Sequence, residues 1–351
     1  MLKDLCFEII QTCPNNCLFC SSCAGMNETT IIDLNEFKKT IDHFMNLGGI
    51  QEISISGGEP FLHPNLFEMV DYCKKLGIRV VLFTSGVKRN IRLSKEQLDE
   101  LRTKIFKYYS SVKDLPQDLV DKYTDRQMSI YNEYNNQVFS SLSHDDLNHL
   151  KEIGLDKIVF DFQGAERETY DYLMGSNHFI MVEQSMLRAV SSGLDIDVHF
   201  VPMKVNYKEF EGLIEILNIA EIKKLSILNF VPQGRGRINQ ELLMMDTEEL
   251  IEFANIYEKS KSIFKGEIRV GIPLISDDKH KCTAGLDKLV IKYDGTVLPC
   301  PAFKEYDLSV LNKIGIRTPN IFTDLSSVKI HNGTRAFPLC KKLYDFTGTI
   351  K

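Results

Sequence analysis

The sequence predicts an α/β protein built on a partial, parallel β/α barrel, and three observations lead to this fold class. Short segments rich in β-branched and aromatic residues alternate with segments of helical periodicity. Six such strand–helix units follow one another, which favours a parallel sheet covered by helices. Six units are fewer than the eight of a closed barrel. We therefore expect an open (β/α)6 barrel with ligands outside the carboxyl ends of its strands.

The strand and helix assignments depend on local patterns. Helical spacing of apolar residues is clear over Asn65–Leu76 and over Thr247–Ser260, and Gly or Pro marks several of the connections. The six predicted strands are Cys6–Ile10, Glu52–Ser56, Arg79–Thr84, Lys157–Phe162, Asp195–Val201 and Lys224–Val231.

One connection is longer than a single helix requires. Between the third and fourth predicted strands, the polar, Tyr-rich segment Lys104–Gln137 is typical of helices, with Pro116 starting a new element. We expect a helical insertion over about residues 88–142. It is either a surface addition or a lid over the active site, since it leaves from the strand ends where ligands bind.

From about residue 266 the pattern changes. Helical periodicity fades, and short strand-like pieces such as Ile268–Gly271 and Lys288–Tyr293 appear with a turn at Asp294–Gly295. We therefore predict two domains, which agrees with a chain of 351 residues. The barrel is expected over 1–265 and a small α+β domain over 266–351.

Composition excludes several classes of protein. The formal net charge is −6 and the pI is about 5.8, which leaves no basic footprint for nucleic acid or an anionic membrane. No apolar stretch approaches the length of a membrane span, and Met1–Gln11 is too short for a signal peptide. We expect a cytoplasmic protein that binds neither nucleic acid nor a membrane.

Nine cysteines are unusual in such a protein, because cytosolic chains rarely form disulfides. Clustered cysteines there more often bind metal or take part in catalysis. Four lie within eleven residues near the N-terminus and three in the last seventy, which suggests two separate sites. Cys6 and Cys73 fall on a strand and a helix core face, where we expect them to be inert. The nine are Cys6, Cys13, Cys17, Cys20, Cys23, Cys73, Cys282, Cys300 and Cys340.

Cys13, Cys17 and Cys20 form a C-x3-C-x2-C motif directly after the first predicted strand. Three thiolates from one loop can hold three corners of a [4Fe–4S] cube and leave the fourth iron open, whereas ordinary electron-transfer clusters use four Cys. With Cys23 included, a four-Cys zinc site or a ferredoxin-type cluster is also conceivable.

The second predicted strand ends in Gly57-Gly58-Glu59-Pro60. By itself this is a tight turn followed by a helix start. At the end of the next strand, however, it places a carboxylate and bare backbone beside the cysteine loop, where an amino group could be bound.

The two motifs together resemble those of the radical S-adenosylmethionine (SAM) superfamily, in which C-x3-C-x-aromatic-C is followed by Gly-Gly-Glu-Pro. The resemblance implies a partial (β/α)6 barrel with a [4Fe–4S] cluster bound by Cys13, Cys17 and Cys20. SAM would bind the open iron, and its reductive cleavage would give a 5′-deoxyadenosyl radical that takes hydrogen from a substrate. A reductant such as flavodoxin or ferredoxin is implied as a partner.

The same resemblance assigns SAM-binding residues. Phe19 would lie near the adenine, and Gly57, Gly58 and Glu59 would bind the amino group. Further contacts at the ends of strands three to five are expected from Ser85, Asp161, Gln163, Val201 and Asn206.

After strand six, Val231–Arg237 is either a Gly-rich turn with solvated arginines or a fixed guanidinium at the barrel mouth. In the second interpretation Arg235 binds a carboxylate or phosphate of SAM or of the substrate.

The C-terminal cysteines resemble the Twitch and SPASM domains of radical SAM enzymes. Cys282 is followed by Gly295-x4-Cys300, and Cys340 comes forty residues later, which suits the shorter form with one auxiliary [4Fe–4S] cluster. A fourth ligand is missing from this set. It could be His280, Asp277, Asp278, a distant Cys or the substrate itself; a structural zinc site or plain core cysteines are the alternatives.

Three functions follow from these assignments. We expect a radical SAM enzyme that modifies a peptide or protein side chain, since many auxiliary-cluster relatives do so. The alternative is oxidation or rearrangement of a small polar metabolite such as a sugar, cyclitol or nucleotide. A non-enzymatic iron–sulfur carrier or zinc protein would leave the Gly-Gly-Glu-Pro motif without a purpose.

Overall fold

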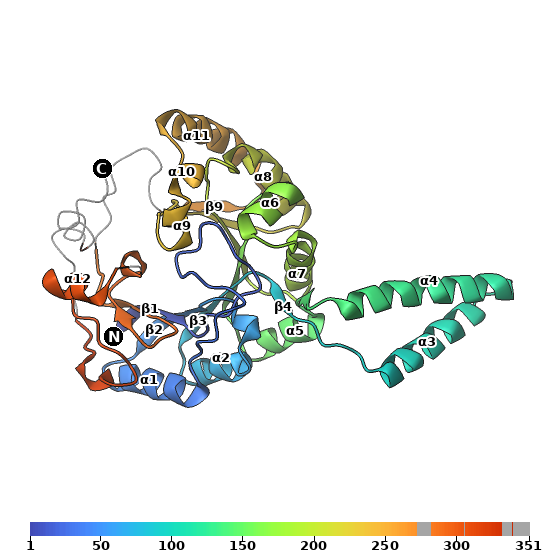
Figure 1. Ribbon diagram of the computed structural model, residues 1–351, viewed down its shortest axis with the longest axis horizontal. Coiled ribbons are helices and arrows are strands. Elements are labelled where there is room, and N and C mark those ends of the chain that lie inside the picture. Colours follow the sequence, from blue (N-terminus) through green and yellow to red (C-terminus); the bar gives the residue numbers. More distant parts are fainter. Residues whose placement is uncertain (272–281, 305, 332–338, 340–351) are drawn as a thin grey trace. The chain divides into compact units, whose positions relative to one another are not determined.

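The computed structural model describes residues 1–271, 282–304, 306–331 and 339, and structural statements below concern these residues. A curved sheet forms the centre of the larger unit, and helices follow its outer side (Figure 1). The strands are β1 (Leu2–Glu8), β2 (Ile50–Ser56), β3 (Arg79–Thr84), β4 (Val87–Arg89), β5 (Phe139–Ser141), β6 (Lys157–Asp161), β7 (Ile196–Phe200), β8 (Lys224–Ile227), β9 (Glu267–Val270), β10 (Lys288–Ile291) and β11 (Val297–Leu298). The α-helices are α1 (Leu34–Asn46), α2 (Leu66–Lys75), α3 (Lys95–Ser110), α4 (Gln117–Asn136), α5 (His144–Glu152), α6 (Arg167–Met174), α7 (Phe179–Ser191), α8 (Phe210–Ile219), α9 (Arg235–Ile238), α10 (Gln240–Leu243), α11 (Thr247–Lys261) and α12 (Leu308–Lys313). Short 3-10 helices are η1 (Pro60–Leu62), η2 (Tyr207–Glu209), η3 (Pro301–Phe303) and η4 (Leu325–Ser327).

The main sheet has nine described strands in the order β11-β10-β1-β2-β3-β6-β7-β8-β9. Every neighbouring pair is parallel except β10 and β11. The carboxyl ends of the parallel strands therefore meet at one edge, where ligands bind in sheets of this kind. The predicted α/β partial barrel is confirmed.

The six predicted strands correspond to β1, β2, β3, β6, β7 and β8. The largest difference at a strand start is in β1, which begins at Leu2 although the sequence pattern predicted a start at Cys6. Polar residues alternate with apolar ones in this strand, so its first half lacks a continuous apolar signal.

Both ends of the sheet come from the C-terminal part of the chain. β9 pairs with β8, and β10 pairs with β1 through the register Asp4↔Lys288 and Cys6↔Val290. These pairings could not be anticipated from local patterns. The predicted domain boundary near residue 266 stays a prediction.

The two faces of the sheet differ in polarity. Outward-facing residues such as Leu5, Phe7, Ile53 and Ile55 are fully buried under helices, and Phe7 packs on Phe37 of α1 at 5.0 Å between ring centroids. The inner face carries polar residues at the alternating positions, and these line cavities. A closed barrel is instead filled by branched apolar side chains. This barrel therefore keeps polar space inside.

Helix starts are defined by capping side chains. Asp33 accepts hydrogen bonds from the backbone of Asn35 and Glu36 at the start of α1. Ser143 before α5 and Asp246 before α11 form capping boxes with the third residue of each helix. These caps satisfy backbone N–H groups that the helix leaves open.

Residues 88–140 form a second compact unit, distinct from the unit made of 1–87 and 141–351. It consists mainly of α3 and α4, which pack on each other, and Pro116 stands directly before α4. The role of this unit as a lid stays a prediction. In the part of the chain that the structure describes, no helix is long and apolar enough to cross a membrane.

Candidate active site at the carboxyl ends of the strands

A cavity of about 580 Å³ opens at the carboxyl ends of β1, β2, β3 and β6. All three motif cysteines line it. Five of the residues predicted to bind SAM line the same cavity, namely Phe19, Gly57, Gly58, Ser85 and Asp161. Two motifs that lie 37 residues apart in sequence therefore face one space.

The cysteine loop is held by backbone contacts on both sides. Asn16 and Leu18 donate to the carbonyls of Met174 and Leu173 at the end of α6, each at 2.9 Å. From the other side, the N–H of Arg235 donates to the Cys20 carbonyl at 3.0 Å. Such a loop has little freedom, so the three thiols are positioned before any ligand arrives.

The thiol environment fits an iron–sulfur cluster. Burial raises the pKa of the Cys13 thiol, and the Glu59 carboxylate raises it further. Burial also raises the pKa of Cys17, with neighbouring Cys13 and Cys20 adding to the effect. Iron needs the thiolate forms, and its positive charge would offset this crowding of negative charge. Within the described ranges, no three His, Cys, Asp or Glu side chains lie close enough to share a single metal ion.

Gly57 and Gly58 let the end of β2 pass directly under the segment that leads into the cysteine loop. A Cβ on Gly57 would lie 2.3 Å from the Ile10 carbonyl oxygen, and one on Gly58 would lie 2.1 Å from that of Thr12. In addition, Gly57 has φ +142°, which favours glycine. The two glycines therefore set the distance between the motifs as well as lining the cavity.

Glu59 is fully buried, and both of its oxygens already accept hydrogen bonds. Oε1 accepts from Thr84 Oγ1 at 2.7 Å and from the N–H of Phe61 at 3.0 Å. Oε2 accepts from the N–H and the hydroxyl of Ser85, both at 2.6 Å. Burial raises its pKa, and these donors act in the opposite direction. In this structure the carboxylate connects the ends of β2 and β3.

Asp161, at the end of β6, is half-buried in the cavity wall. Burial raises the pKa of its carboxyl to about 7, with a smaller contribution from Glu59. No hydrogen bond to its carboxylate occurs among the described residues, so this group can still bind a ligand.

Gln163 and Asn206 instead satisfy buried backbone groups. Gln163 donates to the His199 carbonyl at 3.1 Å and accepts from the N–H of Val201 at 2.8 Å. Asn206 donates to the carbonyls of Gln163 and Val201. Both side chains are fully buried and are not among the described residues that line the cavity. Val201 itself packs with Phe19 against an apolar cluster around Leu173, Met203 and Leu243.

Arg235 lies behind the cysteine loop. Its Nε donates to the Cys17 carbonyl at 2.8 Å, and its charge lowers the pKa values of Cys13 and Cys17 against the stronger effects of burial and neighbouring negative groups. Gly234 has φ +54°, and a Cβ there would lie 2.6 Å from the Cys20 carbonyl oxygen. In the described structure Arg235 does not line the cavity, so its contacts are those of a support for the loop.

Two of the three cysteines predicted for an auxiliary cluster can be placed. Cys282 is buried in an apolar cluster with Phe303 and Leu311, and Cys300 packs against this cluster. Burial raises the pKa of Cys300, and the nearby Cys282 acts in the same direction. Cys340 and the candidate fourth ligands Asp277, Asp278 and His280 lie outside the described residues.

Three side chains in the cavity wall, those of Cys6, Glu8 and Lys304, were not predicted from the sequence to lie there. Cys6 faces the cavity rather than the helix-covered core, and Glu8 at the end of β1 pairs with Lys304 at 2.5 Å. Glu8 also accepts from the Ser22 hydroxyl at 2.7 Å, while its Oε2 has no partner among the described residues. The alternation Asp4, Cys6, Glu8 in β1 was a sequence signal for such an inner polar face.

Comparison with known proteins agrees with the predicted family. Residues 7–132 match the family model described as the Radical SAM superfamily. The resemblance is therefore confirmed for a radical SAM domain in this part of the chain, and the auxiliary-cluster domain stays a prediction.

Several curated relatives are PqqA peptide cyclases. That of Methylorubrum extorquens strain PA1 is 22% identical over 303 residues, which cover 84% of this chain and 65% of the relative. The Methylorubrum populi protein is similar to the same extent. The chain thus spans somewhat less than two thirds of the length of these relatives.

Solved structures share the fold at low sequence identity. Streptococcus suis SuiB bound to its precursor peptide SuiA superposes with a TM-score of 0.62 at 15% identity, covering 92% of this chain and 63% of SuiB. The structure of anSMEcpe with bound AdoMet and the Cp18Cys peptide superposes with a TM-score of 0.58 at 14% identity, and the match covers 98% of this chain and 80% of anSMEcpe.

Proposed function

We propose that the protein is a radical SAM enzyme that modifies a side chain of a peptide or protein. The observation that carries this proposal is the convergence of Cys13, Cys17 and Cys20 with Gly57, Gly58 and Ser85 around one cavity. The names of the relatives, a peptide cyclase and a peptide-bound SuiB, support a peptide as the substrate class.

In this proposal the three thiolates hold a [4Fe–4S] cluster and the cavity beside them holds SAM. When bound and reduced by a partner such as flavodoxin or ferredoxin, these cofactors supply the 5′-deoxyadenosyl radical that takes hydrogen from the substrate. Phe19, the two glycines, Ser85 and Asp161 contact SAM directly. The last four have backbone or polar side-chain groups facing the cavity, and Phe19 offers an aromatic ring.

The remaining residues act through their neighbours. Glu59 orients Ser85, with both groups of Ser85 bonded to Oε2. Gln163 and Asn206 fix the backbone around Val201, and Arg235 supports the cysteine loop. We assign these four polar residues as positioning residues for the SAM site.

The polar inner face of the barrel gives the second candidate its support. A small polar metabolite such as a sugar, cyclitol or nucleotide could bind there in place of a peptide side chain. Both candidates share the same SAM chemistry, so the first experiment tests them together.

The test is anaerobic reconstitution with iron and sulfide, followed by dithionite and SAM. We expect 5′-deoxyadenosine by liquid chromatography and none from a variant with all three motif cysteines changed to alanine. No 5′-deoxyadenosine with or without candidate substrates would reject the enzyme. Transfer of deuterium into 5′-deoxyadenosine from labelled peptides, and not from labelled sugars or nucleotides, would identify a peptide as the substrate.

We further propose an auxiliary [4Fe–4S] cluster at Cys282, Cys300 and Cys340. The closeness of Cys282 and Cys300 in one buried cluster supports it. The variant Cys13→Ala/Cys17→Ala/Cys20→Ala should retain about four iron ions per chain. Adding Cys282→Ala and Cys300→Ala should remove them, and an iron-free triple variant would reject the second cluster.

A further inference from the structure

The cavity lined by the three motif cysteines, called the cluster cavity from here on, continues along the inner face of the barrel into a second cavity of about 400 Å³. The two share part of their walls, so a ligand could extend from one into the other. The shared residues are Glu52, Ser54, Phe83, His199 and Arg269.

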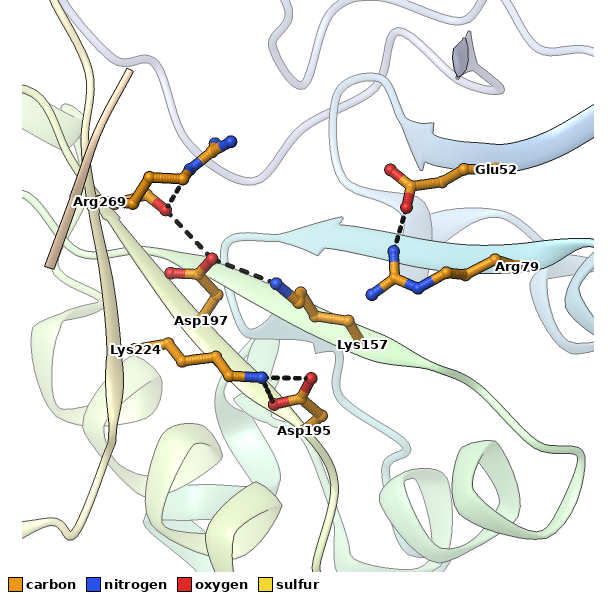
Figure 2. A network of polar contacts seen from close by, with 8 residues as sticks. Glu52, Arg79, Lys157, Asp195, Asp197, Lys224 and Arg269 are labelled. Atoms are coloured by element: carbon orange, nitrogen blue, oxygen red, sulfur yellow. Dashed lines mark hydrogen bonds and ion pairs between the residues drawn. The ribbon is translucent and has the colours of Figure 1, made fainter. Parts of the chain in front are cut away.

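Most charged groups in the second cavity are already paired, and Glu267 is the acidic group of its wall for which no ion pair occurs among the described residues. Lys224 contacts both oxygens of Asp195, at 2.6 and 2.7 Å, and Arg79 pairs with Glu52. Lys157 contacts Asp197 at 3.5 Å. Figure 2 shows these pairs on neighbouring strands. Such groups have little capacity left for a charged ligand.

Arg269 on β9 differs from these residues. Among the described residues it makes one hydrogen bond, from Nε to Ser226 Oγ at 3.4 Å. Ser226 in turn donates to Asp197 at 3.1 Å. In Figure 2 the end of the Arg269 guanidinium points away from Asp197 and Lys157. Contact through Nε thus orients the side chain and leaves both terminal nitrogens available.

His199 stands at the same level of the barrel. Its Cα pairs with that of Ser226, which pairs with that of Arg269. His199 is 8% exposed and lines both cavities, and its ring lies edge-on to that of Phe83 with 5.2 Å between the ring centroids. Burial lowers its pKa to about 4, so at neutral pH the ring is uncharged with one N–H to donate. No hydrogen bond to the ring occurs in the described part of the chain.

We propose that Arg269, assisted by His199, binds a carboxylate carried by the substrate, so that the enzyme selects an acidic peptide side chain. This inference rests on the proposed function and adds the charge of the substrate. A planar carboxylate matches the two terminal nitrogens of a guanidinium. Because Asp197 and Glu267 line the second cavity and Glu8 and Asp161 face the cluster cavity, a doubly charged phosphate would meet more repulsion than a single carboxylate.

The test uses capped amino acids as probes of the reconstituted 351-residue chain with saturating SAM. Ligand-observed NMR would measure dissociation constants for N-acetyl-glutamate N-methylamide and for its glutamine counterpart, which has nearly the same shape. We expect the glutamate probe to bind at least about tenfold more tightly, since charge-assisted bonds are worth more than a decade in affinity. Equal affinity, or no detectable binding, would overturn the proposal.

Substitutions test which residues produce the preference for the glutamate probe. Arg269→Gln should abolish the preference for glutamate, Arg269→Lys should keep part of it, and Ser226→Ala should weaken it by loosening the arginine. Lys224→Gln, whose lysine is already paired with Asp195, is the matched control and should keep the full preference. Circular dichroism and thermal melting check that each variant folds.

Two results separate this inference from other outcomes. If Arg269→Gln weakens SAM itself by tenfold, the guanidinium serves the carboxylate of SAM and the proposal is wrong. The binding assay requires no SAM cleavage, so a wild-type chain that prefers glutamate but forms no 5′-deoxyadenosine would reject only the proposed function.

Discussion

Three glycines let neighbouring backbone pack closely against the cysteine loop and the segment that leads into it. Gly57, Gly58 and Gly234 each stand where a Cβ would lie within 2.6 Å of a carbonyl oxygen of the loop or of the segment leading into it. Backbone atoms cannot move aside as the end of a long side chain can. These glycines are therefore required by close approach, and their replacement should act on the cluster before it acts on the fold.

Gly234→Ala should reduce iron binding after reconstitution by more than half and destabilise the chain by about 3 kcal/mol, through strain at φ +54° and a clash with the Cys20 carbonyl. The matched control is Gly193→Ala, at φ +68° with nothing within 4 Å of the added Cβ. It should cost about 1 kcal/mol and leave iron binding unchanged. Iron assays and urea unfolding measure both; equal iron loss in the two variants would contradict the argument.

Asp161 should make the cluster-free chain less stable as pH rises. The pKa of the Asp161 carboxyl is about 7 in the folded chain, against the ordinary aspartate value of 3.8 that applies to the unfolded chain. Between these two pH values the folded chain therefore binds more protons than the unfolded chain. The contribution to stability is fully present below pH 3.8 and is lost as pH rises through 7. Asp161→Asn should therefore stabilise the chain at pH 8 by about 2 kcal/mol, a figure reduced for partial solvent access.

Urea unfolding at pH 8 and pH 4.5 measures this effect. The gain from Asp161→Asn should fall to about a quarter at the lower pH, because the wild-type carboxyl is then protonated in the folded chain while it is mostly ionised in the unfolded chain, whose pKa of 3.8 lies only slightly below pH 4.5. An equal gain at both pH values would assign the effect to packing rather than to ionisation.

At the scale of elements, β1 is connected to the segment after Cys300 by a buried ion pair. Glu8 is 1% exposed and the Lys304 side chain 11%, with 2.5 Å between Oε1 and Nζ. Removing one partner leaves an uncompensated charge in the protein interior, whereas removing both leaves none. This pair therefore couples the C-terminal region to the strand that leads into the cysteine loop.

Lys304→Met should lower the free energy of unfolding by about 3 kcal/mol, and Glu8→Gln/Lys304→Met should recover much of that loss. Lys3→Met is the control, because Lys3 pairs with Asp287 between the same two regions but is 64% exposed. It should cost less than about 1 kcal/mol. Chemical denaturation gives the coupling energy, and additive losses in the double variant would show that the two charges do not interact.

At the scale of the molecule, residues 88–140 are a compact unit with their own helix pair, entered and left through β4 and β5. The motif cysteines, the glycines and every other described residue of the cluster cavity lie in the other unit. Cluster binding should therefore not depend on the helix pair.

Replacing residues 90–137 by a short Gly-Ser linker should leave iron content unchanged and the melting temperature within a few degrees. If the insertion acts as a lid, SAM cleavage without substrate should rise while coupled turnover falls, because water and reductant reach the site more freely. A chain that no longer binds iron after the replacement would show that the insertion is required for the fold of the barrel.

Local sequence was sufficient for the fold class, the order of six barrel strands and the two motifs of the cluster cavity. Periodicity, turn residues and cysteine spacing are properties of neighbouring residues, and the constraints that create them act within one element or loop. The convergence of Cys13, Cys17 and Cys20 with Gly57, Gly58 and Ser85 followed because parallel strands bring their carboxyl ends to one edge.

Roles that depend on distant partners required the folded chain. The binding of a ligand by Glu59 stays a prediction, and only the folded chain shows that its carboxylate accepts hydrogen bonds from Thr84 and Ser85. The pairing of β10 with β1 and of Lys304 with Glu8 joins residues almost 300 positions apart. Sheet curvature and register choose such partners, and no local pattern encodes them. Arg269 illustrates the difference, since it is an ordinary strand arginine in sequence, whereas in the barrel its one hydrogen bond among the described residues is made through Nε.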